Sequence, residues 1–208
     1  MKVTKEKSAE NRRALIHAAG KLFKRHGING VGVADIGREA GLTHGALYAQ
    51  FDSKEALAAE ALADGLERGY ERRVKSAGDD FNLSDYLDWY LGKRHRDNLE
   101  TGCAMTASGS EIARQGKKVS RAFADGFAKF AQNFERSLGD SKSGASDRER
   151  ALTIASAAIG AVIVSRAVAK AEPKFADDIL AASRRIVGEI AGKSERAKRR
   201  ENAQLGNH

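Results

Sequence analysis

The chain has 208 residues and a formal net charge of +8. This length allows one or two domains, and the positive charge favours polyanionic partners such as nucleic acids. A single cysteine excludes an intrachain disulfide framework and a cysteine-cluster metal site, and it fits a reducing cytoplasm.

Composition and residue pattern predict an all-α protein. The chain has one proline, Pro173, and no run of period-two alternation that would indicate strands. The N-terminus lacks the apolar core of a signal peptide. The longest apolar run, Ala151–Ser165, is shorter than the roughly 18 to 20 residues that cross a bilayer. We therefore expect a cytoplasmic protein with no membrane span.

The N-terminal 53 residues predict a three-helix domain. A first amphipathic helix covers about Ser8–His26 and ends at Gly27. Val33–Phe51 then reads as two short helices, because Gly41 can end one helix in a left-handed conformation and Thr43 can cap the next. This order of helix end and helix cap is typical of a helix-turn-helix motif. The apolar pairs of the two helices are Ile36 with Ala40 and Leu47 with Phe51.

The second of these short helices has an unusual outer face. Its exposed positions are small or hydrogen-bonding residues, with no acidic side chain among them, which suits close approach to a DNA groove. Helix pairs joined by a glycine turn also occur in ordinary bundles. The surrounding charge favours DNA, because residues 1–57 contain ten Lys or Arg against six acidic residues, which is half of the net charge. Lys54 lies in the first turn of the following helix, where an external phosphate matches its charge better than the helix dipole does.

The residues from 54 to 192 predict a larger helical domain. Helices are expected over 54–75, from 84 to a basic end at 96, over 103–115, and beyond Gly116. The last of these carries a mainly aromatic stripe, which indicates either core packing or a ligand pocket. From chemistry and position, the predicted effector-pocket residues are Trp89, Tyr90, Cys103, Met105, Phe123 and Phe127.

The helix from about Arg148 to Lys170 is apolar on nearly every face, so it must be covered on all sides. The helix from about Phe175 can cover one part, and a second copy of the pair could cover the rest in a two-fold four-helix interface. Burial within one subunit is the alternative. The tail, residues 193–208, is basic and predicted to be disordered. The expected interface residues are Ala157, Gly160, Ala161, Val164, Ile179, Ser183, Ile186, Val187 and Ile190.

An ordered series of residues runs through the helix-turn-helix into the next helix: Gly27, Asp35-Ile36, Ala40-Gly41, Gly45, Leu47-Tyr48, Phe51 and Lys54-Glu55. On this series, over about residues 8–60, the chain resembles the TetR family of transcriptional repressors. The resemblance implies a homodimer that binds a palindromic double-stranded DNA operator and releases it when a small effector binds the C-terminal domain. Carried over by position, Tyr48 and Lys54 would contact phosphates, and the start of the recognition helix would be Thr43, His44, Gly45 and Ala46.

Three features, at four positions, depart from the family pattern. Val31 and Gly32 stand where Ser or Thr usually caps the first motif helix and touches phosphate. Gly37 replaces the usual Ala, at an expected cost of about 1 kcal/mol in helix propensity. Gln50 replaces a common His, and we expect it to hydrogen-bond to the backbone.

Other functions stay open at this point. Cys103 begins a helix downstream of a basic cluster, so the signal could be an electrophile or oxidant, although an inert thiol is the simpler interpretation. An enzyme is not expected, because the chain has no phosphate loop, no nucleophile elbow and no zinc-protease run. No cofactor and no metal site are predicted. A basic scaffold that binds polyanions without sequence preference is the remaining alternative.

Overall fold

The computed structural model describes residues 4–100, 102–141 and 144–192, and its regular elements are helical, which confirms the all-α prediction. The chain forms two compact units. The N-terminal unit comprises the chain up to Arg72 together with Asn98–Gly126, and the C-terminal unit comprises Arg73–Asp97 and the chain from Phe127 onward. The domain boundary expected at residue 53 stays a prediction.

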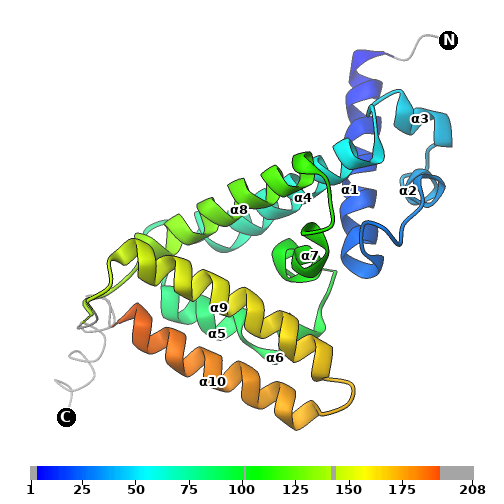
Figure 1. The fold of residues 1–208 in the computed structure, drawn as a ribbon. Coiled ribbons are helices and arrows are strands. Elements are labelled where there is room, and N and C mark those ends of the chain that lie inside the picture. Colours follow the sequence, from blue (N-terminus) through cyan, green and yellow to red (C-terminus); the bar gives the residue numbers. More distant parts are fainter. Residues whose placement is uncertain (1–3, 101, 142–143, 193–208) are drawn as a thin grey trace. The chain divides into compact units, whose positions relative to one another are not determined.

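The N-terminal unit contains the predicted helix-turn-helix (Figure 1). The first helix begins at Lys5, three residues before the predicted start, because the Thr4 hydroxyl accepts the Lys7 N–H at 3.2 Å and caps it. Gly27 ends this helix with φ +76°, as expected. The helices of the unit are α1 (Lys5–His26), α2 (Val33–Glu39), α3 (His44–Tyr48), α4 (Lys54–Arg73), α7 (Ala104–Ile112) and the first part of α8 (Lys117–Glu135).

One hydrophobic core joins the helices of this unit. Leu15 on α1, Ile36 on α2, Leu47 on α3 and Leu57 on α4 are all fully buried in it. Val119, at the start of α8, is fully buried in the same cluster. Because α2 and α3 are only seven and five residues long, their stability comes from this shared burial and not from helix propensity.

The C-terminal unit is built around two long antiparallel helices, which lie side by side in Figure 1. Pro173 occupies the first turn of the second helix, where its missing N–H costs nothing. The Ser165 hydroxyl is fully buried and donates to the Ala176 carbonyl at 2.8 Å, which ties the two helices together. The elements are η1 (Lys75–Asp80), α5 (Leu83–Tyr90), α6 (Lys93–Asp97), the second part of α8, α9 (Asp147–Val168) and α10 (Pro173–Ala191).

The single helix expected from residue 84 to 96 is wrong, because the structure divides it into α5 and α6. The Gly92 N–H turns back to the Trp89 carbonyl at 3.2 Å, and the N–H groups of His95 and Arg96 then restart the helix on the Gly92 carbonyl. A Cβ at Gly92 would lie only 3.0 Å from the Asp88 carbonyl oxygen, so the break is built for glycine.

A buried arginine fixes the base of the α9–α10 pair. Arg150, in the first turns of α9, donates to the carbonyls of Ile190 and Ala191 at the end of α10 and to that of Gly139. Arg150 thereby supplies donors to two of the last carbonyls of α10 and to one carbonyl of the loop before α9. The predicted disordered tail, residues 193–208, lies outside the described residues.

Candidate nucleic-acid interface

The helix-turn-helix is held in one geometry by its turn and by burial beneath it. Gly41 has φ +66°, as the left-handed turn requires, and the Leu42 N–H donates to the Gly37 carbonyl at 2.8 Å. Ile36 and Leu47 face inward and are fully buried. With these side chains inside, the opposite side of α3 must face solvent.

The solvent face of α3 consists of the residues predicted for DNA contact. Thr43, His44 and Gly45 are exposed, Ala46 is half-buried, and the side chain of Tyr48 is 54% exposed. The rings of His44 and Tyr48 lie 5.4 Å apart, so they form one aromatic and polar edge. No Asp or Glu occurs from residue 41 to 51, so this edge meets a phosphate backbone without a repelling charge.

Thr43 occupies the predicted N-cap position, but it caps α3 through its backbone. Its carbonyl accepts the Ala46 N–H at 3.1 Å, and its side chain makes no cap hydrogen bond. The exposed hydroxyl is therefore not used to cap its own helix. It remains available to a partner outside the helix.

The start of α4 is anchored beside this surface. Ser53 caps this helix, because its hydroxyl accepts the Ala56 N–H at 3.1 Å. Phe51 is buried under the guanidinium of Arg12, which lies 4.2 Å from the ring centroid and also donates to Glu60 at 2.6 Å. Lys54 is half-buried in the first turn of a helix whose origin is thus fixed.

The structure explains two of the three departures from the family pattern and corrects the third. Val31 is buried in the core, and Gly32 is the N-cap of α2, where its N–H donates to Asp35 at 3.3 Å. A Cβ at Gly37 would lie 3.1 Å from the Leu42 carbonyl oxygen, so this glycine allows a tight turn. The expectation that Gln50 bonds to the backbone is wrong, because its amide donates to the Ser8 hydroxyl at 2.9 Å.

The six predicted effector-pocket residues are divided between the units. Cys103, Met105 and Phe123 belong to the N-terminal unit, whereas Trp89, Tyr90 and Phe127 belong to the C-terminal unit. Tyr90 and Met105 are buried, and the other four are half-buried. Within the C-terminal unit the Trp89 and Tyr90 rings are in contact, with centroids 5.9 Å apart. Whether these six residues bind an effector stays a prediction.

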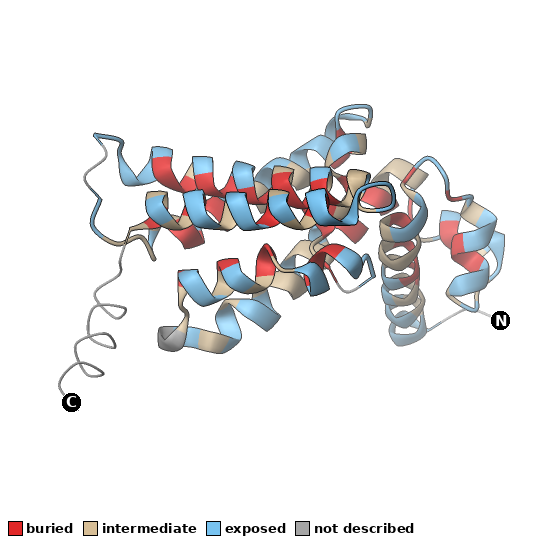
Figure 2. Cartoon of the chain, turned by 90° about the horizontal axis from the view of Figure 1, so that it is seen from below, coloured by how far each residue is buried: buried red, intermediate tan, exposed pale blue. Residues whose placement is uncertain are grey.

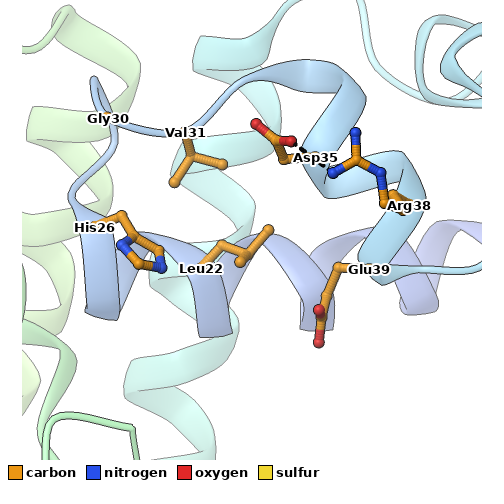
Figure 3. Close-up of a pocket in the computed structure, with 7 residues that line it drawn as sticks. All are labelled: Leu22, His26, Gly30, Val31, Asp35, Arg38 and Glu39. Atoms are coloured by element: carbon orange, nitrogen blue, oxygen red, sulfur yellow. Dashed lines mark hydrogen bonds and ion pairs between the residues drawn. The ribbon is translucent and has the colours of Figure 1, made fainter.

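Each unit has a described cavity. The cavity of the C-terminal unit, about 440 Å³, lies where α5 meets the end of α10 and includes Asn82, Arg184 and Gly188. The cavity of the N-terminal unit is about 420 Å³ and lies between the end of α1 and α2 (Figure 3). Figure 3 shows the ion pair of Asp35 and Arg38 at its rim. None of the predicted effector residues lines either cavity.

A buried polar cluster in the C-terminal unit was missed by sequence reasoning, which placed its residues at a basic helix end. His95 is 2% exposed, and its Nδ1 lies 2.7 Å from the Tyr90 carbonyl oxygen. Burial lowers the pKa of His95 to about 4. Arg166 on α9 donates to the carbonyls of His95 and Arg96, and so holds the end of α6. Among the described residues, no group of three or more His, Cys, Asp or Glu could hold a metal ion.

The predicted interface residues on α9 and α10 differ in burial. Figure 2 shows α9 and α10 with buried stripes and exposed stripes along their lengths. Ala161 and Val187 are buried within the unit, whereas Val164 is 50% and Ile186 42% exposed. Ala157 is also exposed, and a Cβ added at Gly160 would meet no atom within 4 Å. The half-buried members of the predicted set are Gly160, Ile179, Ser183 and Ile190.

By length and composition alone α9 could cross a membrane, a test that the core helix of a soluble protein also passes. Its most apolar window is 44% buried within the protein, so the finding is weak evidence for a span.

Comparison with known proteins places the helix-turn-helix in a family. The model of bacterial regulatory proteins of the tetR family matches residues 15–61. The chain is 32% identical over 90 residues to the HTH-type regulator YfiR of Bacillus subtilis, covering 42% of this chain and 44% of YfiR. It is 35% identical over 74 residues to the HTH-type regulator TtgR of Pseudomonas putida, covering 36% of this chain and 35% of TtgR. The chain thus matches less than half of the length of these relatives.

Solved structures share the fold over most of the chain. The reduced form of E. coli NemR superposes with a TM-score of 0.68 at 17% identity, covering 89% of this chain and 98% of NemR. A TetR-family regulator from Agrobacterium tumefaciens gives a TM-score of 0.67 at 18% identity, covering 86% and 97%. A structure described as showing control of antibiotic production by bacterial hormones gives 0.61 at 19% identity, covering 85% and 94%.

The similar proteins are transcriptional regulators and not enzymes, which agrees with the prediction from the sequence that the chain is not an enzyme. The family expected from the ordered residues of the helix-turn-helix is the one that the family model matches. The helix-turn-helix region of the chain, residues 15–61, therefore belongs to the tetR family of bacterial regulatory proteins.

Proposed function

We propose that the protein is a cytoplasmic DNA-binding transcriptional regulator, a repressor that a small effector releases from a palindromic operator. The observation that carries this proposal is the exposed, acid-free edge of α3, formed by Thr43, His44 and Tyr48 over a rigid buried turn. The names of its relatives, YfiR and TtgR, support the same function. An edge of this kind reads bases in the major groove.

The residues of this edge have different roles in the proposal. Thr43, His44, Gly45 and Ala46 enter the major groove, where their small or hydrogen-bonding side chains allow the helix to approach base edges. Tyr48 and Lys54 bind phosphates and set the register on the duplex. Phosphate contacts add affinity for every sequence, whereas base-edge contacts add affinity only for the operator.

The uncovered surface of α9 and α10 supports a homodimer. Val164 and Ile186 are exposed apolar side chains, and Ala157 and Gly160 leave room for another helix to approach closely. A second copy of the same pair would bury this surface in a two-fold four-helix interface. The two identical helix-turn-helix motifs of such a dimer would bind two identical half-sites, so the operator should be palindromic.

The first experiment selects bound duplexes from a random DNA pool with the full chain. The proposal expects a palindromic consensus that the protein binds at least about a thousand times more tightly than random DNA at fixed salt. Equal affinity for consensus and random duplexes would instead show a nonspecific polyanion-binding protein. A small-molecule screen for release of the consensus duplex then tests the effector.

Point variants test the roles of individual residues. Tyr48→Ala and Thr43→Ala should weaken operator binding. Tyr48→Phe keeps the ring and removes the hydroxyl, whereas Thr43→Ser keeps the hydroxyl and removes the methyl group. Lys54→Ala should weaken binding to all sequences and reduce the slope of log affinity against log salt by about one. If Thr43→Ala and Tyr48→Ala both bind like the native protein, the recognition helix is placed wrongly.

A charge placed on the apolar surface tests the dimer. Val164→Glu and Ile186→Glu should convert the dimer to monomer in sedimentation velocity, because two buried carboxylates would face each other across the two-fold axis. Lys174→Glu, an exposed position at the start of α10, is the control and should leave the dimer intact. A native chain that sediments as a monomer would refute the homodimer.

A thiol signal is a second candidate for release. Cys103 is half-buried at the N-cap of α7, and it lies near enough to Lys24 to interact electrostatically with its ammonium. Burial lowers the pKa of Lys24, and Cys103 acts against that lowering. An electrophile such as N-ethylmaleimide should then release DNA from the native protein and not from Cys103→Ser. Equal release from both proteins would exclude the thiol as the sensor.

A further inference from the structure

A carboxylate from α7 binds the loop that joins α1 to α2. Glu111 accepts the Ile28 N–H at 2.7 Å through Oε2 and the Asn29 N–H at 2.7 Å through Oε1. Both oxygens of one side chain thus bind two successive backbone donors. Ile28 and Asn29 directly follow the end of α1 and its C-cap. Both residues lie more than eighty positions from Glu111 in the sequence.

The loop is shaped to receive this carboxylate. Gly27 has φ +76° and ψ 163°, a conformation that is essentially restricted to glycine, and it turns the next two N–H groups toward the same point. A Cβ at Gly27 would lie 2.9 Å from Glu111 Oε2. A Cβ at Gly30 would collide with the His26 carbonyl oxygen, so the loop is also tight beyond the carboxylate. Two glycines therefore serve one anion-binding turn.

Other contacts hold both ends of the α7 segment against α1. Before α7, Lys24 donates to the carbonyls of Glu100 and Gly102, each at 3.2 Å, and Arg25 pairs with Glu100. After α7, the Gln115 amide donates to the Asn29 side chain at 3.2 Å. Glu111 lies between these two groups of contacts and is the one that binds the loop backbone itself.

The path of this loop determines where the helix-turn-helix starts. Ile28 and Val31, on either side of the bend, are 5% and 4% exposed and pack in the same core as Ile36 of α2. A shift of the backbone at Ile28 and Asn29 would therefore move side chains on which α2 packs. Tightly packed cores transmit such shifts and do not absorb them.

We propose that Glu111 is a positioning residue for operator binding, because its carboxylate fixes the α1–α2 loop and through it the orientation of α2 and α3. This inference rests on the proposed DNA-binding function. Glu111 contacts no DNA itself. It acts through the two amides that it binds, so operator affinity depends on an anion bound at these amides.

The experiment compares full-length Glu111→Ala and Glu111→Gln with the native chain and with Ser110→Ala, an exposed neighbour on α7. Hydrogen exchange of the Ile28 and Asn29 amides reports the carboxylate contact without DNA. Binding of the selected operator reports its consequence. Each variant is assayed in potassium chloride and in potassium acetate of equal ionic strength, because acetate can replace the missing carboxylate and salt alone changes DNA affinity.

The expected result is a graded loss of function. Glu111→Ala should exchange both amides at least about tenfold faster and bind the operator about tenfold more weakly, with Glu111→Gln between it and the native protein. Acetate should raise the operator affinity of Glu111→Ala by a larger factor than that of Ser110→Ala and the native chain, a difference that a general loss of stability would not produce.

Two outcomes would overturn the proposal. Unchanged exchange at Ile28 and Asn29 in Glu111→Ala would show that the carboxylate does not hold the loop. Faster hydrogen exchange of these amides together with native operator affinity would show that the loop does not determine the orientation of α2 and α3. If the native chain binds no DNA specifically, the proposed function fails, while the exchange measurement still decides whether Glu111 binds the loop.

Discussion

Arg150 should be one of the most sensitive positions of the C-terminal unit. Its side chain is 4% exposed, and its guanidinium donates to the carbonyls of Gly139, Ile190 and Ala191 at 2.8 to 2.9 Å. The substitution Arg150→Met keeps an apolar stem of similar length and removes every donor. It therefore isolates the hydrogen bonds from the packing of the side chain.

The size of the effect follows from these acceptors. Each buried carbonyl that loses a charged donor costs about 1–3 kcal/mol. The pair with Asp147 adds little, because that carboxylate is 64% exposed. Removing the guanidinium also removes its own desolvation cost, so we expect a net loss of about 3–5 kcal/mol in the free energy of unfolding.

Urea unfolding at pH 7 measures this loss, at one fixed protein concentration because the stability of the proposed dimer would depend on concentration. Arg148→Met is the matched control. Arg148 is 48% exposed and pairs with Glu135 at 3.5 Å, so its loss should stay within about 0.5 kcal/mol. A loss below about 1 kcal/mol for Arg150→Met, or equal losses for both variants, would refute the reasoning.

Three further changes should also affect stability. Gly27→Ala should cost about 2–3 kcal/mol in urea unfolding, because alanine is strained at φ +76° and its Cβ would press on Glu111; a loss under about 1 kcal/mol would contradict this. Ser165→Ala should cost about 1–2 kcal/mol, because the buried Ala176 carbonyl loses its hydroxyl donor, and no loss would mean that water replaces it. Burial lowers the pKa of His95 from 6.5 to about 4, so between these pH values only the unfolded chain binds this proton and stability falls as the pH falls. The drop in unfolding free energy between pH 7 and pH 5 should be about 2 kcal/mol smaller in His95→Gln than in the native chain.

The helices could be predicted where one stretch of sequence contains both the periodicity and the end signals. Gly27 and Gly41 act locally, and each has a positive φ at the predicted helix end in the structure. The break at Gly92 was missed because the apolar stripe runs up to Leu91, directly before the glycine, and the basic residues 93–96 after it resemble the end of the same helix. An isolated glycine inside a helical pattern was the signal that could have indicated it.

The polar clusters could not be predicted, because their partners are distant in the sequence. His95 and Arg96 look like ordinary charged residues at a helix end, and only Arg166 and the surrounding aromatic rings make them interior groups. Glu111 has no local partner that distinguishes it from any exposed glutamate. The face of α3 was predictable for the opposite reason, because helical periodicity alone decides which of its side chains turn inward.

The close approach of Gly37 to the Leu42 carbonyl oxygen limits how freely the helix-turn-helix of this chain can be exchanged with those of relatives. Family members usually carry alanine there, and in this chain a methyl group would lie 3.1 Å from the Leu42 carbonyl oxygen. A recognition helix transplanted alone would meet a turn built for a different spacing. Swapping operator specificity between members therefore requires residues 37–50 to be moved as one block, with the glycine and the turn inherited together.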